Sequence, residues 1–236
     1  FWPGPLSLVL PKADSIPDIV TAGGKTVAVR CPAHPVFSAV LAKCGFPLAA
    51  PSANRSNHVS PTRAEHVVDQ LGGYIPLVLD GGSCDIGIES TVIDLTGDTP
   101  TLLRPGMISL GQLQAVIGSV AVAKPPTDDE LLKSPGQLQK HYSPRAKLVV
   151  CGDLATALAQ ADETTHVIAH EPAPAIWPGE RWHHLPGAAT DFARELYDTL
   201  HRCDRLGAGT ILVQSLPGTD EWAALRDRLN RAAAEG

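Results

Sequence analysis

The sequence lacks the motifs that mark several common classes of protein. Its five cysteines are widely spaced and include no C-x-x-C pair, so neither a zinc site of paired cysteines nor a disulfide framework is indicated. The C-terminal half has no G-x-G-x-x-G motif, the signature of a dinucleotide site. No run approaches the roughly 18 to 20 consecutive apolar residues of a membrane-spanning helix. The cysteine pattern is typical of reduced thiols, so we predict a cytoplasmic protein with no membrane partner.

Basic residues are also too few to create a field that attracts polyanions. Nineteen Lys and Arg residues stand against 25 Asp and Glu residues, which gives a formal net charge of −6 at pH 7. This balance does not draw a protein onto nucleic acid or anionic lipid. Any contact with RNA would therefore have to be local.

Two different patterns lie on either side of a proline-rich segment. Before it, many short apolar runs and fewer helices predict a twisted, mixed open sheet. After it, strands and helices alternate, which predicts a small Rossmann-like α/β domain with a largely parallel sheet. The predicted domains are residues 1–122 and 147–236, joined by a linker at 123–146.

The apolar patterns also predict individual elements. In the first domain, strands are expected at 6–10, 26–30, 75–80 and 90–95 and in the run that ends at Ala50, with helices at 35–43, 62–71 and 110–117. In the second domain, strands are expected at KLVVCG, THVIAH, RWHHLP and TILVQ, with helices after Asp153, at 191–206 and near the C-terminus.

The segment PLAAPSANRSNHVSPT, residues 47–62, changes from apolar to small and polar and ends at a helix start. Its serine and asparagine side chains can donate to phosphate, carboxylate or ribose oxygens without filling the space of a ligand. Ser60 or Thr62 is expected to cap the helix, which should bury a face containing Val67 and Val68. A polar loop before a helix N-terminus suits an anion. The same pattern also describes an ordinary polar strand-to-helix turn.

Two polar residues are expected at strand ends and a third at a turn. Arg30 ends an apolar strand, where a buried guanidinium would need a carboxylate or phosphate partner, and an internal salt bridge is one alternative. Arg104 precedes Pro105 and Gly106, so its backbone is extended or turning and its side chain can reach a phosphate. Ser90 begins a strand, and an ordinary strand-start serine is the alternative to a ligand contact.

Three groups of potential metal ligands are not predicted to bind a metal. His166 and His170 are four residues apart, but the residues between them resemble a strand and no third ligand is evident. His183 and His184 point to opposite faces if they lie in a strand. The acidic run 128–130 is expected to be solvated linker rather than a magnesium site.

Six separated blocks form a specific pattern along the chain. They are FWPGPLSLVL (1–10), TVAVRCPAHP (26–35), PLAAPSANRSNHVSPT (47–62), GGSCDIGIESTVIDL (81–95), LLRPG (102–106) and SPGQLQKHYSP (134–144). In this order they resemble the threonylcarbamoyl-AMP synthase family, the YrdC-domain proteins, in its longer two-domain form. The resemblance implies a YrdC-like mixed sheet, an interdomain linker at the last block and a smaller C-terminal domain.

The resemblance also implies a reaction. The family makes threonylcarbamoyl-AMP and pyrophosphate from ATP, L-threonine and bicarbonate, the first step towards threonylcarbamoyladenosine in certain tRNAs. Mg²⁺ would accompany ATP, a downstream tRNA-modifying transferase complex would take the product, and direct tRNA binding would be weak or absent. This chemistry needs anions positioned against a triphosphate, so we assign no catalytic side chain and no metal ligand.

Individual residues follow from the resemblance by position. Thr26, Ser52, Asn54, Ser60, Arg104 and Tyr142 match ATP-binding positions, and Arg30, Ala50 and Ser90 match threonine-binding positions. Through Tyr142 the linker would cover the nucleotide as a lid and shield the mixed anhydride from water.

The sequence departs from the family at its start. The family carries a segment before FWPGPL, with Lys-x-Arg and Thr-x-Tyr-Gly motifs that contribute to the pocket, and this sequence begins at Phe1. We expect the chain by itself to fold incompletely in its first domain and to be a poor catalyst. Two alternatives stay open. A non-catalytic YrdC-type RNA-binding or ribosome-maturation module is opposed by the acidic charge, and the YrdC-like part of a hydrogenase-maturation carbamoyltransferase is opposed by the missing C-x-x-C motifs.

Overall fold

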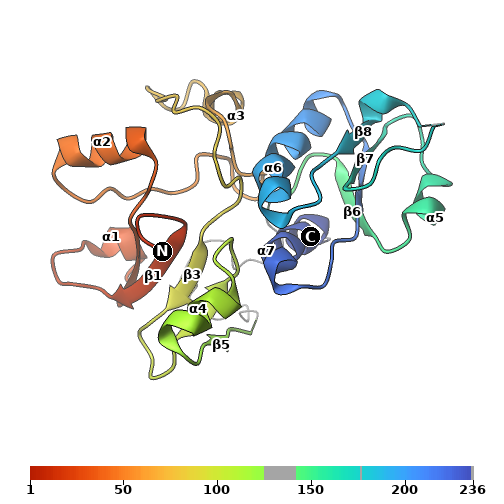
Figure 1. Cartoon of the computed structure of the whole chain (residues 1–236). Coiled ribbons are helices and arrows are strands. Elements are labelled where there is room, and N and C mark those ends of the chain that lie inside the picture. Colours follow the sequence, from red (N-terminus) through yellow and green to blue (C-terminus); the bar gives the residue numbers. More distant parts are fainter. Residues whose placement is uncertain (125–141, 176, 235–236) are drawn as a thin grey trace. The chain divides into compact units, whose positions relative to one another are not determined.

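The structure of the chain, a computed structural model, describes residues 1–124, 142–175 and 177–234 (Figure 1). Most of the predicted linker at 123–146, including the acidic run 128–130, lies outside the described residues.

Two compact units divide the described residues between them. Unit 1 is drawn from Phe1–Pro51 and Glu89–Gln139, and unit 2 from Ser52–Ile88 and Lys140–Gly236. The segment Ser52–Ile88, which the sequence assigns to the first domain, thus clusters with the C-terminal part of the chain. The domain boundaries predicted from the sequence stay a prediction.

Unit 1 contains a mixed sheet, as the sequence predicts. Its strands are β1 (Leu6–Pro11), β2 (Thr26–Arg30), β3 (Thr91–Asp94), β4 (Thr101–Arg104) and β5 (Ala121–Val122). The strand order is β2-β1-β3-β4-β5. β1 pairs antiparallel with β2 and parallel with β3, while β4 pairs antiparallel with β3 and parallel with β5. Strands β4 and β5 were not predicted.

Helix α4 (Leu110–Ile117) packs on this sheet and begins with a capping box. The Ser109 hydroxyl accepts from the Gln112 N–H, and the Gln112 side chain accepts from the Ser109 N–H, which satisfies backbone donors at the helix start. Two more helices, α1 (Asp18–Thr21) and α2 (Pro35–Cys44), belong to unit 1. The buried core of unit 1 includes Leu6, Ile93, Leu102, Leu113 and Val120.

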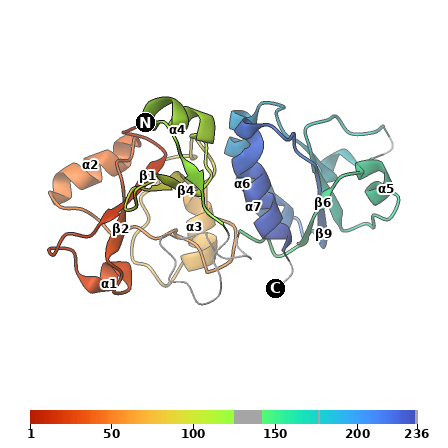
Figure 2. The same cartoon turned by 90° about the horizontal axis from the view of Figure 1, so that it is seen from below.

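Unit 2 contains a four-stranded, all-parallel sheet, which confirms the prediction for the C-terminal domain. Its strands are β6 (Lys147–Cys151), β7 (Thr165–Ala169), β8 (Trp182–His184) and β9 (Thr210–Gln214), in the order β6-β9-β7-β8. Its helices in this region are α5 (Leu154–Leu158), α6 (Ala189–Arg205) and α7 (Ala223–Ala233), with 3₁₀ turns at Gly179–Arg181 and Asp220–Trp222. Helices α6 and α7 cover one face of the sheet and α5 the other (Figure 2). Over the described ranges, no helix is both long and apolar enough to cross a bilayer.

Two predicted strands are wrong. Neither the run that ends at Ala50 nor residues 75–80 form a strand, and the side chains of Leu77 and Leu79 are largely exposed. A strand forms only where a neighbouring strand satisfies its backbone N–H and C=O groups. Neither run joins a sheet in the part of the chain that the structure describes. Apolar composition alone was therefore not sufficient to predict a strand at either place.

The helix after the polar loop also differs from the prediction. Helix α3 spans Ala64–Leu71, and its N-cap residue is Arg63, which makes no side-chain capping bond. Neither Ser60 nor Thr62 therefore caps it. Val68 is 53% exposed, whereas His66 is 1% exposed. The buried face of α3 is set by its contacts with α6, which the local apolar pattern does not contain.

Candidate functional site

In unit 1, three polar side chains from separate parts of the chain meet in the sheet. The Arg104 Nε donates to the Ser90 carbonyl oxygen at 3.1 Å, and Arg104 Nη2 donates to Ser90 Oγ at 3.2 Å. The hydroxyl of Ser7 lies 2.8 Å from that of Ser90. All three residues are buried. The structure therefore brings together Ser90, predicted to bind threonine, and Arg104, predicted to bind ATP.

Strand register explains this meeting. β1 runs parallel to β3 with Ser7 opposite Val92, and Val92 is in turn opposite Arg104 across the β3–β4 pair. Gly106 lets the turn after β4 close on β3, because a Cβ on it would lie 2.3 Å from the Thr91 nitrogen. The Thr91 hydroxyl fixes the same turn by donating to the Ile108 carbonyl at 2.8 Å.

Ser7 is a member of this cluster that sequence reasoning missed. The available signal was a serine within the apolar strand LSLVL, in a block that matches the family. A guanidinium with two hydroxyls offers hydrogen-bond donors in a fixed arrangement. Such a set suits a carboxylate or phosphate better than a bare cation.

The two predicted residues on β2 lie at opposite ends of that strand. Arg30 is opposite Ser7 in the β1–β2 register, whereas Thr26 is opposite Pro11, about 13 Å away along the strand. The Arg30 side chain is exposed and has no ion pair within the described ranges. The alternative of an internal salt bridge is therefore not seen among the described residues, and the predicted contact of Arg30 with threonine stays a prediction. Arg30 thus shares an end of the sheet with Ser90 and Arg104, and Thr26 does not.

The residues where the two units divide are exposed. Ala50 belongs to unit 1 and Ser52 to unit 2, and both lie outside helices and strands. Their predicted contacts with threonine and ATP stay predictions.

In unit 2, the polar loop is held by its own amides and by α3. Asn54 Nδ2 donates to the carbonyls of Arg55 (2.9 Å) and His58 (3.0 Å). Gln70 of α3 accepts from the Arg55 N–H at 3.0 Å and donates to the Val59 carbonyl at 3.2 Å. The Asn54 Oδ1 is buried and accepts no hydrogen bond from the described residues. The loop therefore has a defined shape and offers a buried acceptor.

Residues in the C-terminal part of the predicted linker also hold the loop. Ser143 N–H donates to the Asn57 carbonyl at 2.9 Å, and Asn57 has a φ of +66°. Tyr142 is 1% exposed, and its ring packs near Tyr197 (centroids 6.0 Å apart) and the Arg228 guanidinium (5.2 Å). Tyr142 is thus an anchor of unit 2, and its predicted contact with the nucleotide stays a prediction.

Two histidines that the sequence analysis did not single out lie beside the loop. His201 of α6 donates from Nε2 to the Ser60 carbonyl at 3.1 Å. Its ring stacks on His66 with centroids 3.9 Å apart. Burial lowers the pKa of both rings, that of His66 to about 4, so both are neutral near pH 7. No sequence signal pairs them, because they are separated by more than a hundred residues.

A pocket of ≈ 200 Å³ lies at the N-terminus of α3. Its lining residues are Arg63, Ala64, Glu65, Asp80, Gly82 and Ser83. The carboxylates of Glu65 and Asp80 make this pocket unfavourable for an anionic ligand. A pocket of ≈ 410 Å³ lies between β6 and the end of α7, lined by Lys147, Leu148, Val149, Val150, Asn230, Ala233 and Ala234, none of which was predicted to bind a substrate.

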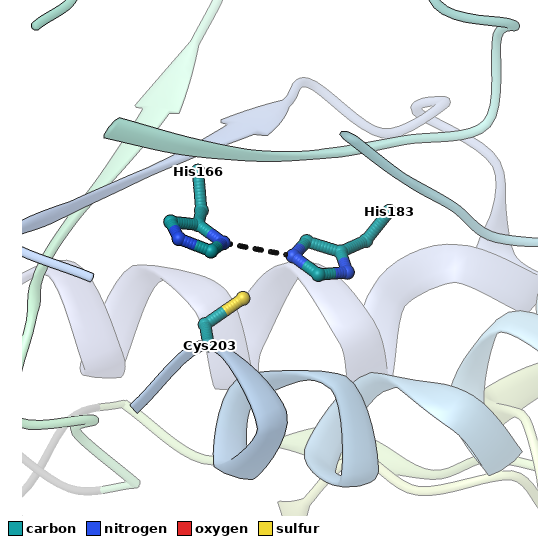
Figure 3. A group of neighbouring side chains, drawn as sticks. All are labelled: His166, His183 and Cys203. Carbon is teal, nitrogen blue, oxygen red and sulfur yellow. Dashed lines mark hydrogen bonds between the residues drawn. The ribbon is translucent and has the colours of Figure 1, made fainter. Parts of the chain in front are cut away.

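The structure shows a histidine pair that the sequence analysis did not consider. His166 contacts His183 rather than His170: its Nδ1 lies 3.0 Å from His183 Nε2, and Cys203 of α6, a third potential ligand, lies nearby (Figure 3). Burial lowers the pKa of His183 to about 4 and raises that of Cys203 to about 12. The cluster therefore holds neutral imidazoles and a protonated thiol, and the facing ring nitrogens satisfy each other by a hydrogen bond.

A second group of potential ligands consists of Glu65, His66 and Asp198. Asp198 is paired with Arg63 at 2.7 Å, and Glu65 lies 3.5 Å from Arg205. Because cationic side chains already accompany both carboxylates, this group resembles a surface ion-pair network more than a cation site.

Comparison with known proteins identifies the family. Residues 1–106 match the Sua5/YciO/YrdC family model, described as Telomere recombination, and residues 108–234 match the model described as Threonylcarbamoyl-AMP synthase, C-terminal domain. The chain is 39% identical to the threonylcarbamoyl-AMP synthase of Bacillus subtilis, over 99% of this chain and 70% of that protein. It is 36% identical to that of Schizosaccharomyces pombe, over 99% of this chain and 64% of that protein.

A solved structure agrees with these matches. The crystal structure of Pyrococcus abyssi Sua5 complexed with L-threonine superposes with a TM-score of 0.89 at 35% identity, over 99% of this chain and 71% of that one. The matches to both domain models agree with the relatives that match nearly the whole chain and with the shared fold. The chain therefore belongs to the threonylcarbamoyl-AMP synthase family, in its two-domain form.

Proposed function

We propose that the chain forms threonylcarbamoyl-AMP and pyrophosphate from ATP, L-threonine and bicarbonate. The observation that carries the proposal is the buried contact of Arg104 with Ser90, two residues that the family resemblance assigns to ATP and to threonine. The relative from Pyrococcus abyssi, whose structure was solved with L-threonine, supports a threonine site in this fold.

The reaction requires the substrates to be held in line. The threonine amine and bicarbonate combine to an N-carboxylate and water, and a carboxylate oxygen then attacks the α-phosphorus of ATP while pyrophosphate leaves. Arg30, exposed at the end of β2, would bind the threonine carboxylate, and Arg104 would compensate phosphate charge. Positioning two anions against a triphosphate is a large part of such catalysis.

Mg²⁺ would reach the site bound to ATP. The cluster of Ser7, Ser90 and Arg104 donates hydrogen bonds and would orient the anionic groups around the ion rather than ligate it. In unit 2, the hydroxyl and amide groups of the polar loop, including Asn54 and Ser60, would contact the nucleotide. The linker, through Tyr142, would then shield the mixed anhydride from water.

The setting of the reaction belongs to the same proposal. Every cysteine of the chain is a free thiol, which supports a reducing compartment such as the cytoplasm. The product would pass to a tRNA-modifying transferase complex, with weak or no direct tRNA binding by a chain of net charge −6.

Pyrophosphate release tests the proposal, measured on this chain and on a version extended upstream by the segment that the family carries. Release should require both threonine and bicarbonate, and mass spectrometry should find threonylcarbamoyl-AMP. Ser90→Ala should reduce the rate, because Arg104 loses a partner. Ser109→Ala, which removes a helix cap outside the cluster, is the matched control. Release that is independent of threonine in both versions would refute the proposal.

A further inference from the structure

We propose that His201 is a positioning residue that fixes the backbone of the polar loop at Ser60, so that α6 sets how the loop receives ATP. The inference rests on the proposed function, because Ser60 is one of its ATP contacts. His201 lies on a helix of the C-terminal part of the chain, to which no residue-level role in the reaction was assigned.

The direct contact is a hydrogen bond to main chain. His201 Nε2 lies 3.1 Å from the Ser60 carbonyl oxygen, and because that oxygen can only accept, Nε2 carries the proton. Ser60 itself is 8% exposed. A hydrogen bond to the Ser60 carbonyl restrains the plane of the Ser60–Pro61 peptide. This restraint limits the backbone conformation of Ser60 and so the direction of its side chain.

A second contact fixes the ring of His201. It stacks on His66 at 3.9 Å between centroids, with an interplanar angle of 23°. His66 Nδ1 accepts from the Thr62 N–H at 3.3 Å, so its Nε2 carries the proton and faces Asp198 Oδ1 at 3.5 Å. The two stacked rings are therefore held in defined orientations beside the Ser60–Thr62 backbone.

A third contact joins the same two elements at the surface. Asp198, one turn before His201 on α6, accepts from Arg63 Nε at 2.7 Å. Residues Ser60, Thr62 and Arg63 are thus all restrained, directly or through His66, by one face of α6. Because α6 is a 17-residue helix packed on a parallel sheet, this support is more rigid than a loop would be.

A tether of this kind predicts a specific kinetic effect. Loss of the His201 hydrogen bond lets the Ser60 peptide rotate, so fewer molecules present the loop in the binding conformation and the apparent affinity for ATP falls by that fraction. The threonine site in unit 1 contains none of these residues, so threonine affinity should stay unchanged.

The test compares His201→Ala with His201→Gln, whose amide retains a donor, and with His184→Ala as the control. His184 makes the same type of bond, an imidazole to the His170 carbonyl at 3.2 Å, outside the loop. Hydrogen exchange of the amides between Val59 and Thr62 should accelerate in His201→Ala, and the KM for ATP should rise about tenfold with a smaller change in kcat. His201→Gln should recover part of both effects, and His184→Ala should show neither.

Three results would overturn the inference. They are an unchanged exchange rate in His201→Ala, faster exchange with an unchanged KM for ATP, and equal effects in His184→Ala. Circular dichroism confirms that each variant is folded. If neither this chain nor the version extended upstream releases pyrophosphate with threonine and bicarbonate, the proposed function fails, and the exchange comparison by itself still decides whether His201 restrains the loop.

Discussion

Gly87 is predicted to be one of the most sensitive positions in unit 2, because a side chain there has no space. Its φ is +83°, and a Cβ would lie 2.2 Å from the Ala193 carbonyl oxygen and 2.5 Å from the Arg194 Cα. Both atoms belong to the backbone of α6. Neither can move without distortion of the helix, so Gly87→Ala should force the segment away from α6.

Gly82 provides the matched control. Its φ is +86°, but a Cβ there meets no atom within 4 Å. In both alanine variants a left-handed backbone costs about 1 to 2 kcal/mol. Gly87→Ala adds a steric conflict comparable to overpacking of a core, about 1 to 3 kcal/mol. The difference between the two variants therefore isolates the close approach.

Urea unfolding followed by tryptophan fluorescence measures this difference. Trp182 and Trp222 are both buried in unit 2, so their emission reports its unfolding. With a slope of about 2 kcal/mol per M, the midpoint of Gly87→Ala should lie about 0.5 to 1.5 M below that of Gly82→Ala. Equal midpoints would refute the packing of the segment against α6. A loss of the Arg194 bond to the Asp85 carbonyl, 2.9 Å in the structure, should accompany the shift.

Three other predictions follow from the site and from the buried polar groups. Arg30→Ala should mainly weaken threonine binding and Arg104→Ala mainly ATP binding, each by about 1.5 to 3 kcal/mol in isothermal titration; unchanged affinities in both variants would contradict the assignment. The unfolding free energy should fall as the pH drops from about 6.5 to 4, by up to about 1.4 kcal/mol per pH unit for each imidazole, because the pKa values of His66 and His183 are about 4 in the folded state and the unfolded chain binds more protons in that range. His183→Gln should flatten this slope, and an identical slope would argue against burial of the neutral ring. Arg228→Ala should lower the free energy of unfolding by about 2 to 4 kcal/mol, because the fully buried guanidinium packs on a tyrosine and pairs with an aspartate at 2.6 Å; a loss below 0.5 kcal/mol in urea titration would refute this packing role.

Local patterns sufficed for much of the fold. The runs at 6–10 and 26–30 became β1 and β2, and the predicted helix at 191–206 became α6 with a one- to two-residue shift. Alternation of strands and helices after Lys147 predicted the parallel sheet. These elements were predictable because each run carries its own periodicity and also finds a partner in the fold.

The wrong predictions share a physical cause. In each case the structure of the segment depends on a partner that lies far away in the sequence. Residues 75–80 are as apolar as a strand, yet they join no sheet among the described residues. α3 buries His66 rather than Val68 because its inner face meets α6, which comes much later in the sequence. The sequence analysis also did not consider the contact of His166 with His183, which depends on how β8 pairs with β7 and not on the spacing within either strand.

The same contrast between local patterns and distant partners applies to the candidate site. Arg104 and Ser90 were found through the family blocks, and the structure brings them together. Ser7, His66 and His201 were missed, because their roles arise from strand register and from helix packing rather than from a local motif. Family resemblance therefore found residues that match known positions, whereas the residues that support them required the three-dimensional structure.

The discontinuous make-up of unit 2 has a consequence for how the protein matures during translation. The polar loop is synthesised early, but its bonds to Ser143 and His201 join it to residues made much later, 141 positions later in the case of Ser60 and His201. At about 5 to 20 residues per second, a ribosome needs on the order of 10 s to make that stretch. During this time the nascent loop and α3 lack their supporting helix, and the polar loop gains its full set of hydrogen bonds only after α6 has emerged.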